Sequence, residues 1–184
     1  MLEGFLRAIG TYAVYEKWLD GQVRKQPVPE HIGIILDGNR RWAFARSGAT
    51  YEGHMRGAKT GHRFLEWCLD LDIKTVTLYI FSMENFNRPR PEVDTILGIV
   101  EDEARRLLKD PRLHQNGVRV KAIGRLDLLP QSLQQVLREI EEATASYNKH
   151  YLNFALAYGG RTEIIDAARK IAQDVGMGSV KPAE

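Results

Sequence analysis

A short apolar run that ends in polar residues constrains this sequence most. Residues 32–36 read Ile-Gly-Ile-Ile-Leu, and residues 37–39, Asp-Gly-Asn, follow directly. A run of this length, rich in β-branched residues and closed by turn formers, predicts a strand that is buried on both faces. Open α/β sheets bind ligands beyond the carboxyl ends of their strands. The sequence therefore predicts that Asp37, Arg40 and Arg41 lie where a ligand binds.

These side chains suit a diphosphate that is held by Mg²⁺. A carboxylate is the hard oxygen ligand that Mg²⁺ prefers, and the ion commonly shares it with substrate phosphates. Guanidinium groups offer planar, bidentate donors to phosphate oxygens. A strand-end Asp-Gly-Asn sequence is also a common turn without any function. The interpretation therefore depends on whether other strand ends carry similar chemistry.

The rest of the chain predicts an alternation of strands and helices. Apolar spacing predicts strands over 32–37, 74–81, 118–123 and 151–157, and helices over 54–70, 92–109, from Pro130 onward and over 161–175. Four strand–helix units indicate an α/β fold with an open, mostly parallel β-sheet and helices on both faces. No dinucleotide-binding glycine fingerprint follows the first strand, so a Rossmann fold that binds dinucleotides is not expected.

Residues 1–26 form a separate N-terminal segment, which prolines at 27 and 29 divide from the first strand. Its apolar residues recur at roughly helical spacing and predict an amphipathic helix over 2–24: Leu2, Phe5, Ile9, Tyr12, Leu19 and Val23. Such a helix packs on its own domain or lies on a membrane surface. Because the polar face is not especially basic, packing on the domain is favoured.

Composition excludes several classes of protein. The chain has 184 residues, enough for one domain with a core, and its net charge of +2 gives no argument for binding nucleic acid. The single cysteine, Cys68, excludes a disulfide framework, favours a reducing compartment and is expected to be buried. No apolar stretch approaches the roughly 20 residues that span a bilayer, and the N-terminus lacks the compact apolar core of a signal peptide.

Two further strand ends carry unusual polar chemistry. Residues 81–89, Phe-Ser-Met-Glu-Asn-Phe-Asn-Arg-Pro, place a hydroxyl, a carboxylate, amides and an arginine between aromatic residues. Residues 158–161 read Tyr-Gly-Gly-Arg, and His54 is expected at the start of a helix, where exposed amides favour anions. Each feature alone could be an ordinary loop or cap. Because all three strand ends should open on one edge of a parallel sheet, their convergence predicts one site.

Four blocks of this sequence resemble the cis-prenyltransferases, the undecaprenyl and longer polyprenyl diphosphate synthases. The blocks are His-Ile-Gly-Ile-Ile-Leu-Asp-Gly-Asn-Arg-Arg-Trp-Ala at 31–43, Gly-His-x-x-Gly at 53–57, the segment 81–89, and Asn-Phe-Ala-Leu-Ala-Tyr-Gly-Gly-Arg at 153–161. They occur in the family's order. The Arg-Arg form of the first block, with Tyr-Glu-Lys-Trp-Leu upstream, is similar to archaeal and eukaryotic-type members.

The resemblance implies a Mg²⁺-dependent transferase. It would condense isopentenyl diphosphate with an allylic starter, farnesyl or geranylgeranyl diphosphate, and form each new double bond in the cis configuration. The long-chain polyprenyl diphosphate would be a lipid carrier precursor for glycosylation or cell-envelope synthesis. The resemblance also implies a cytoplasmic homodimer without a nucleic-acid partner, and peripheral membrane contact, since a polyprenyl product partitions into lipid at about 0.8 kcal/mol per buried CH₂.

The resemblance assigns roles to individual residues. Asp37 would bind Mg²⁺ at the diphosphate and promote its departure, and Asn85 would help to remove a proton from the incoming isopentenyl unit. The implied substrate-binding residues are Gly38, Asn39, Arg40, Arg41, Trp42, His54, Ser82, Met83, Glu84, Phe86 and Arg88. The inward faces of helices 54–70 and 92–109 could wall an apolar tunnel, but ordinary core packing explains them equally well.

Two alternatives stay open. The family continues with an Arg-Thr-x-Gly-Glu segment and an Arg-x-Ser-Asn-Phe block that bind isopentenyl diphosphate, and neither is in this sequence. We therefore expect residues 27–184 to form a catalytic domain that is incomplete at its C-terminus, which keeps open a truncated diphosphate- or lipid-binding module. The other alternative is a non-catalytic partner subunit of a heteromeric prenyltransferase. The intact residues 37–41 argue against it, because inactive subunits have lost them.

Overall fold

A computed structural model describes residues 11–46 and 48–181 of the chain. Within these ranges four strands form one parallel sheet: β1 (His31–Ile35), β2 (Thr75–Ser82), β3 (Val118–Ile123) and β4 (His150–Tyr158). The strand order across the sheet is β1-β2-β4-β3. The predicted class, an open parallel α/β sheet, is confirmed, and each strand lies within two residues of its predicted bounds.

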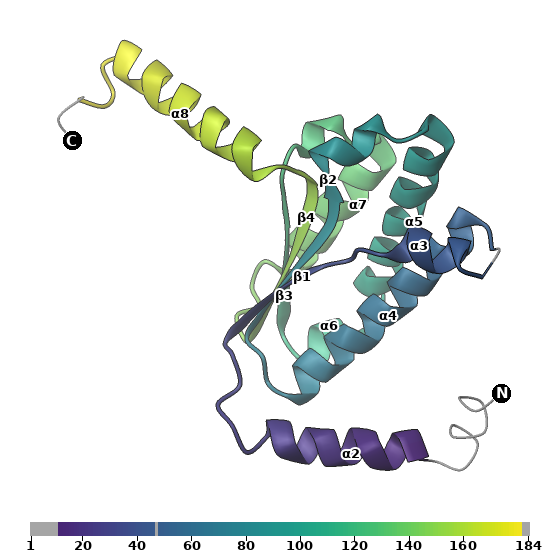
Figure 1. The fold of residues 1–184 in the computed structure, drawn as a ribbon. Helices are drawn as coiled ribbons and strands as arrows, with labels where there is room; N and C mark the ends of the chain where they lie inside the picture. The colour runs from purple at the N-terminus through teal and green to yellow at the C-terminus, as the bar shows by residue number, and fades with distance from the viewer. Residues whose placement is uncertain (1–10, 47, 182–184) are drawn as a thin grey trace.

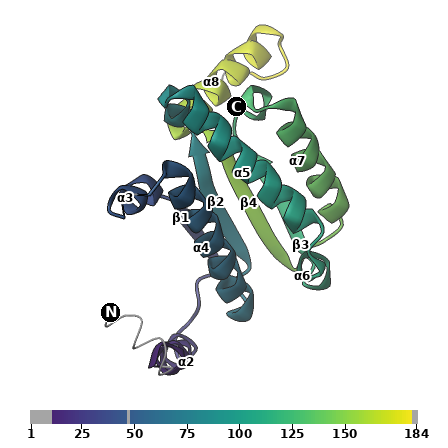
Figure 2. The same ribbon diagram turned by 90° about the vertical axis from the view of Figure 1, so that its right-hand side faces the viewer.

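Helices cover one face of this sheet. The described helices are α2 (Thr11–Val23), α3 (Asn39–Phe44), α4 (Thr50–Asp70), α5 (Arg90–Leu108), α6 (Pro111–Gln115), α7 (Gln131–Thr144) and α8 (Gly160–Gly176), with short 3₁₀ segments η1 (Met83–Asn87) and η2 (Leu126–Leu128). Figures 1 and 2 show α4, α5 and α7 side by side over the same face, whereas α8 leaves the end of β4 and points away from the sheet. We expected helices on both faces. The second face is open in the described part of the chain because α8, which follows the last strand, buries none of its residues there.

The hydrophobic core lies between the sheet and these three helices. Its fully buried side chains include Phe81 and Leu156 from the strands and Leu133, Leu137 and Ile140 from α7. Burial on this scale is the main favourable term in folding. The predicted burial of Cys68 is confirmed: its thiol is 2% exposed, and loss of hydration raises its pKa to about 11.

The first strand differs from its prediction. We expected β1 to be buried on both faces, but its residues alternate between exposed and half-buried, and Ile35 is 69% exposed. β1 lies at the edge of the sheet, and only Ile32 and Ile34 pack against the core. The open second face is therefore the physical reason for the difference.

The N-terminal helix also departs from expectation. α2 confirms the helix over 11–23, while Leu2, Phe5 and Ile9 lie outside the described residues. Glu16 of α2 pairs with Arg63 of α4. The side chains of residues 14–23 are nonetheless exposed, so this stretch does not pack an apolar face on the domain. No helix in the described ranges is long and apolar enough to cross a membrane.

The contrast between α7 and α8 gives a stability prediction. Leu137→Ala removes a side chain that is 2% exposed, and we expect the free energy of unfolding to fall by about 2–5 kcal/mol because a cavity remains. Ile171→Ala on α8 removes a side chain that is 60% exposed and should change it by no more than about 0.5 kcal/mol. Urea unfolding of both variants measures the difference. Comparable losses in the two would show that α8 packs on the core.

Candidate active site

The site begins at the turn after β1. Asp37 lies two residues beyond the strand, and its Oδ1 accepts a hydrogen bond of 2.5 Å from the Gly38 backbone N–H. Gly38 has φ +89°, a left-handed conformation that glycine adopts without steric cost, and it caps the start of α3. Arg41, one turn into α3, places Nη2 3.3 Å from Asp37 Oδ2. The turn therefore holds a carboxylate, 76% exposed, beside a guanidinium group.

Two glycines allow α4 to approach this turn closely. A Cβ at Gly53 would overlap the carbonyl oxygen of Asn39, and a Cβ at Gly57 would lie 2.5 Å from Asn39 Oδ1. The spacing of these glycines puts both on the same face of α4. The Gly-His-x-x-Gly block is therefore the surface on which α3 rests, and it fixes the position of the Asn39 side chain.

His54 lies between these glycines, inside α4 rather than at its start. The helix begins at Thr50, four residues before the predicted start, so His54 does not present a free helix terminus, contrary to our expectation. Its side chain is 9% exposed, and its Nε2 lies 3.5 Å from Glu92 Oε1 without a hydrogen-bond partner among the described residues. The pKa of His54 is lowered, because burial disfavours the charged ring more than Glu92 favours it. His54 is therefore neutral at neutral pH.

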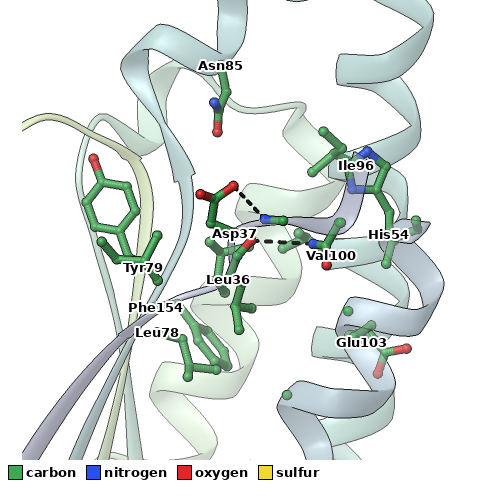
Figure 3. Close-up of a pocket in the computed structure, with 18 of the residues that line it drawn as sticks. Leu36, Asp37, His54, Leu78, Tyr79, Asn85, Ile96, Val100, Glu103 and Phe154 are labelled. Carbon is green, nitrogen blue, oxygen red and sulfur yellow. Dashed lines mark hydrogen bonds between the residues drawn. The ribbon is translucent and has the colours of Figure 1, made fainter. Parts of the chain in front are cut away.

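The end of β2 contributes a second group of polar residues. The Ser82 backbone N–H donates to Asn85 Oδ1 over 3.0 Å, and the Ser82 side chain accepts from the Asn85 backbone in a reciprocal capping box. This arrangement starts η1 and orients the Asn85 side chain. Figure 3 shows the amide of Asn85 pointing toward the carboxylate of Asp37, which comes from the neighbouring strand. Convergence of the first two strand ends is confirmed.

These residues form one end of a cavity of about 630 Å³. The polar end is lined by Asp37, Gly38, Asn39, Arg40, Arg41, His54, Ser82, Asn85 and Arg88. The remainder is mainly apolar and is lined by Ala58 and Leu65 of α4, Leu78 and Phe154 of the sheet, and Ile96, Val100 and Leu107 of α5. The inward faces of α4 and α5 therefore border a cavity as well as the core. A ligand with an anionic head and a hydrocarbon tail would match both ends.

Four predicted substrate-binding residues do not line this cavity: Trp42, Met83, Glu84 and Phe86. The Trp42 ring, 36% exposed, lies 4.5 Å beneath the Arg46 guanidinium group. Phe86 packs edge-on against Phe81 with ring centroids 4.9 Å apart. The third strand end does not line the cavity either, since none of residues 158–161 is among its lining residues, and Arg161 instead lies close enough to Glu84 to help lower the pKa of that carboxyl. Trp42, Met83 and Phe86 are engaged in packing contacts outside the cavity, whereas Glu84 is exposed.

Sequence reasoning missed three polar side chains with titratable groups around the cavity. Glu92 contacts His54, and Glu103 and His62 line the less polar part, where His62 Nε2 lies 2.7 Å from Glu103 Oε2. All three belong to amphipathic helices, in which charged residues usually face solvent. The spacing of Arg88 and Glu92, four residues apart, was a signal that could have identified their pair.

The polar end also fits a magnesium ion. Within residues 11–46 and 48–181, no three His, Cys, Asp or Glu side chains are placed to bind one metal ion. Mg²⁺ commonly keeps several waters and uses one or two carboxylates together with substrate phosphates. The exposed Asp37 carboxylate beside cationic side chains suits that mode, in which the diphosphate supplies the remaining ligands.

A glycine substitution tests how α4 positions Asn39. In Gly57→Ala the new methyl group displaces the Asn39 side chain, and we expect the affinity for Mg²⁺ with inorganic diphosphate to fall about tenfold, a loss of ~1.4 kcal/mol. Isothermal titration calorimetry measures this change. Gly61→Ala is the matched control on the same helix, because its nearest neighbour, Leu36 Cδ1, would lie 4.0 Å away. Equal affinities in the two variants would contradict the role of Gly57.

The buried imidazole gives a prediction on pH. Because the folded-state pKa of His54 lies below its ordinary value of 6.5, the unfolded chain takes up this proton first as the pH falls. The contribution of His54 to stability is therefore complete above pH 6.5 and is lost as the pH falls toward its folded-state pKa. Urea unfolding between pH 8 and 5 should show a steeper loss of stability in the unmodified chain than in His54→Gln. Parallel curves for the two proteins would contradict this prediction.

Comparisons with known proteins agree with this geometry. Residues 35–183 match the family described as "Putative undecaprenyl diphosphate synthase". A tritrans,polycis-undecaprenyl-diphosphate synthase (geranylgeranyl-diphosphate specific) of Archaeoglobus fulgidus is 48% identical over 94% of this chain and 69% of its own length. A protein of the same name from Thermococcus kodakarensis is 43% identical over 95% of this chain and 66% of its own length. The chain thus spans about two thirds of the length of these relatives.

Solved structures show the same fold. A lavandulyl diphosphate synthase from Lavandula x intermedia, in complex with dimethylallyl diphosphate, has a TM-score of 0.80 and 36% identity over 84% of this chain and 66% of that one. A probable undecaprenyl diphosphate synthase from Campylobacter jejuni has a TM-score of 0.64 and 29% identity over 81% of this chain and 64% of that one. The matched family, the identities and the shared fold together show that this chain belongs to the cis-prenyltransferase family.

Proposed function

We propose that this chain acts as a cis-prenyltransferase, condensing isopentenyl diphosphate with an allylic diphosphate to give a polyprenyl diphosphate. The observation that carries the proposal is one cavity with a cationic end and an apolar remainder, as an allylic diphosphate requires. The relatives are named as geranylgeranyl-diphosphate specific, which supports geranylgeranyl rather than farnesyl diphosphate as the starter.

The polar end would bind the diphosphate of the starter. Arg40, Arg41 and Arg88 offer guanidinium donors, and the backbone at Gly38 and the side chain of Asn39 complete the lining. Negative charge grows on the diphosphate as it leaves, so donors that are fixed in advance stabilise the transition state more than the ground state. Mg²⁺, held by Asp37 when bound, would supply further stabilisation of that charge.

The reaction is an alkylation followed by loss of a proton. The terminal alkene carbon C4 of isopentenyl diphosphate bonds to C1 of the starter as the C1–O bond breaks and diphosphate leaves. A proton then leaves C2 of the isopentenyl unit, and the double bond moves from C3–C4 to C2–C3. An amide is too weak a base to keep that proton. Since Asn85 Oδ1 already accepts from Ser82, we assign to Asn85 a positioning role, in which its Nδ2 group donates to a diphosphate oxygen that receives the proton.

The apolar part of the cavity would hold the growing chain. Leu78 and Phe154 from the sheet face Ile96 and Val100 of α5 across it (Figure 3). Each CH₂ transferred from water to such a surface contributes about 0.8 kcal/mol. A product of this kind would serve as a lipid carrier precursor and would bring the protein, as a cytoplasmic homodimer, into peripheral contact with a membrane.

A second candidate is a diphosphate-binding module without turnover. Such a module needs only the cationic end of the cavity, which Arg40, Arg41 and Arg88 line. A non-catalytic partner subunit is less well supported, because residues 37–41 keep their carboxylate and both arginines at the cavity.

Removal of one carboxylate tests the activity. Asp37→Ala should abolish incorporation of labelled isopentenyl diphosphate into extractable product, at least about 10³-fold (~4 kcal/mol), and leave the unfolding transition unchanged because Asp37 is exposed. The assay contains Mg²⁺ and geranylgeranyl diphosphate. Asp102→Ala, an exposed site on α5, is the control and should retain activity. Product from a folded Asp37→Ala protein would refute the assigned role, and absence of product from the unmodified chain would favour the module.

A further inference from the structure

One carboxylate behind the cavity contacts three of the side chains that line it. Glu92 Oε1 lies 3.1 Å from Arg88 Nη1, 3.5 Å from His54 Nε2 and 3.7 Å from Arg40 Nε. The contact with Arg88 is a hydrogen bond. The three partners come from different elements: Arg40 from α3, His54 from α4 and Arg88 from the residue after η1. A single oxygen thus joins three separate segments of the polar end.

Glu92 does not itself face the ligand space. Arg40, His54 and Arg88 all line the cavity, and Glu92 is not among its lining residues. The Glu92 side chain is 15% exposed, and that of Arg88 is 23% exposed, so their pair is shielded from water more than the surface ion pairs of this chain. Any effect of Glu92 on a ligand must therefore pass through its partners.

We propose that Glu92 is a positioning residue that holds Arg40, His54 and Arg88 in the orientation in which they meet the diphosphate. This inference rests on the proposed function for the identity of the ligand. A long arginine side chain loses rotational freedom when it binds an anion, and a partner that fixes it beforehand removes that cost from binding. Supporting groups of this kind are what keep a binding constellation in its productive geometry.

Glu92 would have the opposite effect if it competed with the diphosphate for the N–H donors of the arginines. The geometry supports this competition less well than positioning. A guanidinium group has five N–H donors, and Glu92 takes one from Arg88, which leaves the others for a ligand. The carboxylate can therefore stay in place when the diphosphate binds. It also stabilises the pocket before binding, since it balances charge that would otherwise lie partly buried and unpaired.

Two conservative variants separate the reach of the Glu92 side chain from its charge. Glu92→Asp keeps the charge but is one CH₂ shorter and cannot make the 3.1 Å contact with Arg88. Glu92→Gln keeps the reach, and its amide oxygen can still accept from Arg88, but the charge is lost. The control is Asp94→Asn on the same helix, which removes the charge from an exposed pair with Arg90 at 3.0 Å, and neither of these two residues lines the cavity.

The experiment measures the dissociation constant of inorganic diphosphate with Mg²⁺ by calorimetry on the full chain. If the length of the Glu92 side chain positions its partners, Glu92→Asp should raise the dissociation constant at least about tenfold over that of the unmodified chain. The constant of Glu92→Gln should stay within about threefold of the unmodified value, and that of Asp94→Asn should be unchanged. Thermal unfolding of each variant is recorded in parallel. A general loss of structure would weaken binding in proportion to the lost stability and would not be rescued by glutamine.

Every other pattern overturns the inference. If Glu92→Gln weakens diphosphate binding as much as Glu92→Asp does, or more, the effect belongs to the charge of Glu92. Tighter binding in either variant would make Glu92 a competitor of the diphosphate. Unchanged affinities in both variants would leave Glu92 without a role. An unmodified chain that does not bind diphosphate would refute this inference and the proposed function together. A chain that binds diphosphate but yields no labelled product would refute the proposed function alone, and the affinities of the variants would still decide the role of Glu92.

Discussion

The close approach of α4 to α3 is the contact on which the site depends. It is possible because Gly53 and Gly57 present no side chain to Asn39, whose backbone and side chain occupy the space that a Cβ would need. The same contact places His54 between the two glycines, facing the cavity, and holds the turn at Asp37 against the helix that walls the cavity. Backbone packing thus sets the geometry of the polar end before any ligand contributes to it.

Much of the fold could be predicted because its signals are local. The strands and the long helices follow from alternation and from helical spacing, and turn residues mark where each strand ends. α3 was not predicted, since a helix over Asn39–Phe44 is too short for a periodic signal and depends on its packing against α4. The exposure of α8 was not predictable either. Periodicity shows that Ile164 and Ile171 share a face but not what covers that face.

The site residues also separate into those that local sequence signals predict and those that depend on tertiary structure. Asp37 and Asn85 were found because strand-end turns in a parallel sheet bring polar residues to one edge, and the structure places both at the cavity. Phe86 and Met83 stand beside Asn85 in the chain, yet they pack with the core, since successive residues of the tight segment η1 point in different directions. Glu92 went unnoticed because it resembles any charged residue on an amphipathic helix. Its importance comes from three partners distant in sequence, which only the tertiary structure brings together.

The charges at the polar end explain why such a carboxylate belongs there. Arg40, Arg41 and Arg88 line one end of a mainly apolar cavity, and Arg88, whose side chain is 23% exposed, is the one that is costly to leave without a partner. Asp37 pairs with Arg41, and Glu92 pairs with Arg88 and Arg40, so the arginines are partly neutralised before a ligand arrives. The two carboxylates differ in exposure, 76% for Asp37 and 15% for Glu92. In the proposed function, the exposed one would turn from its arginine to a metal ion, whereas the shielded one would stay with its partners. One pair would then open when diphosphate binds while the other keeps the donors in place.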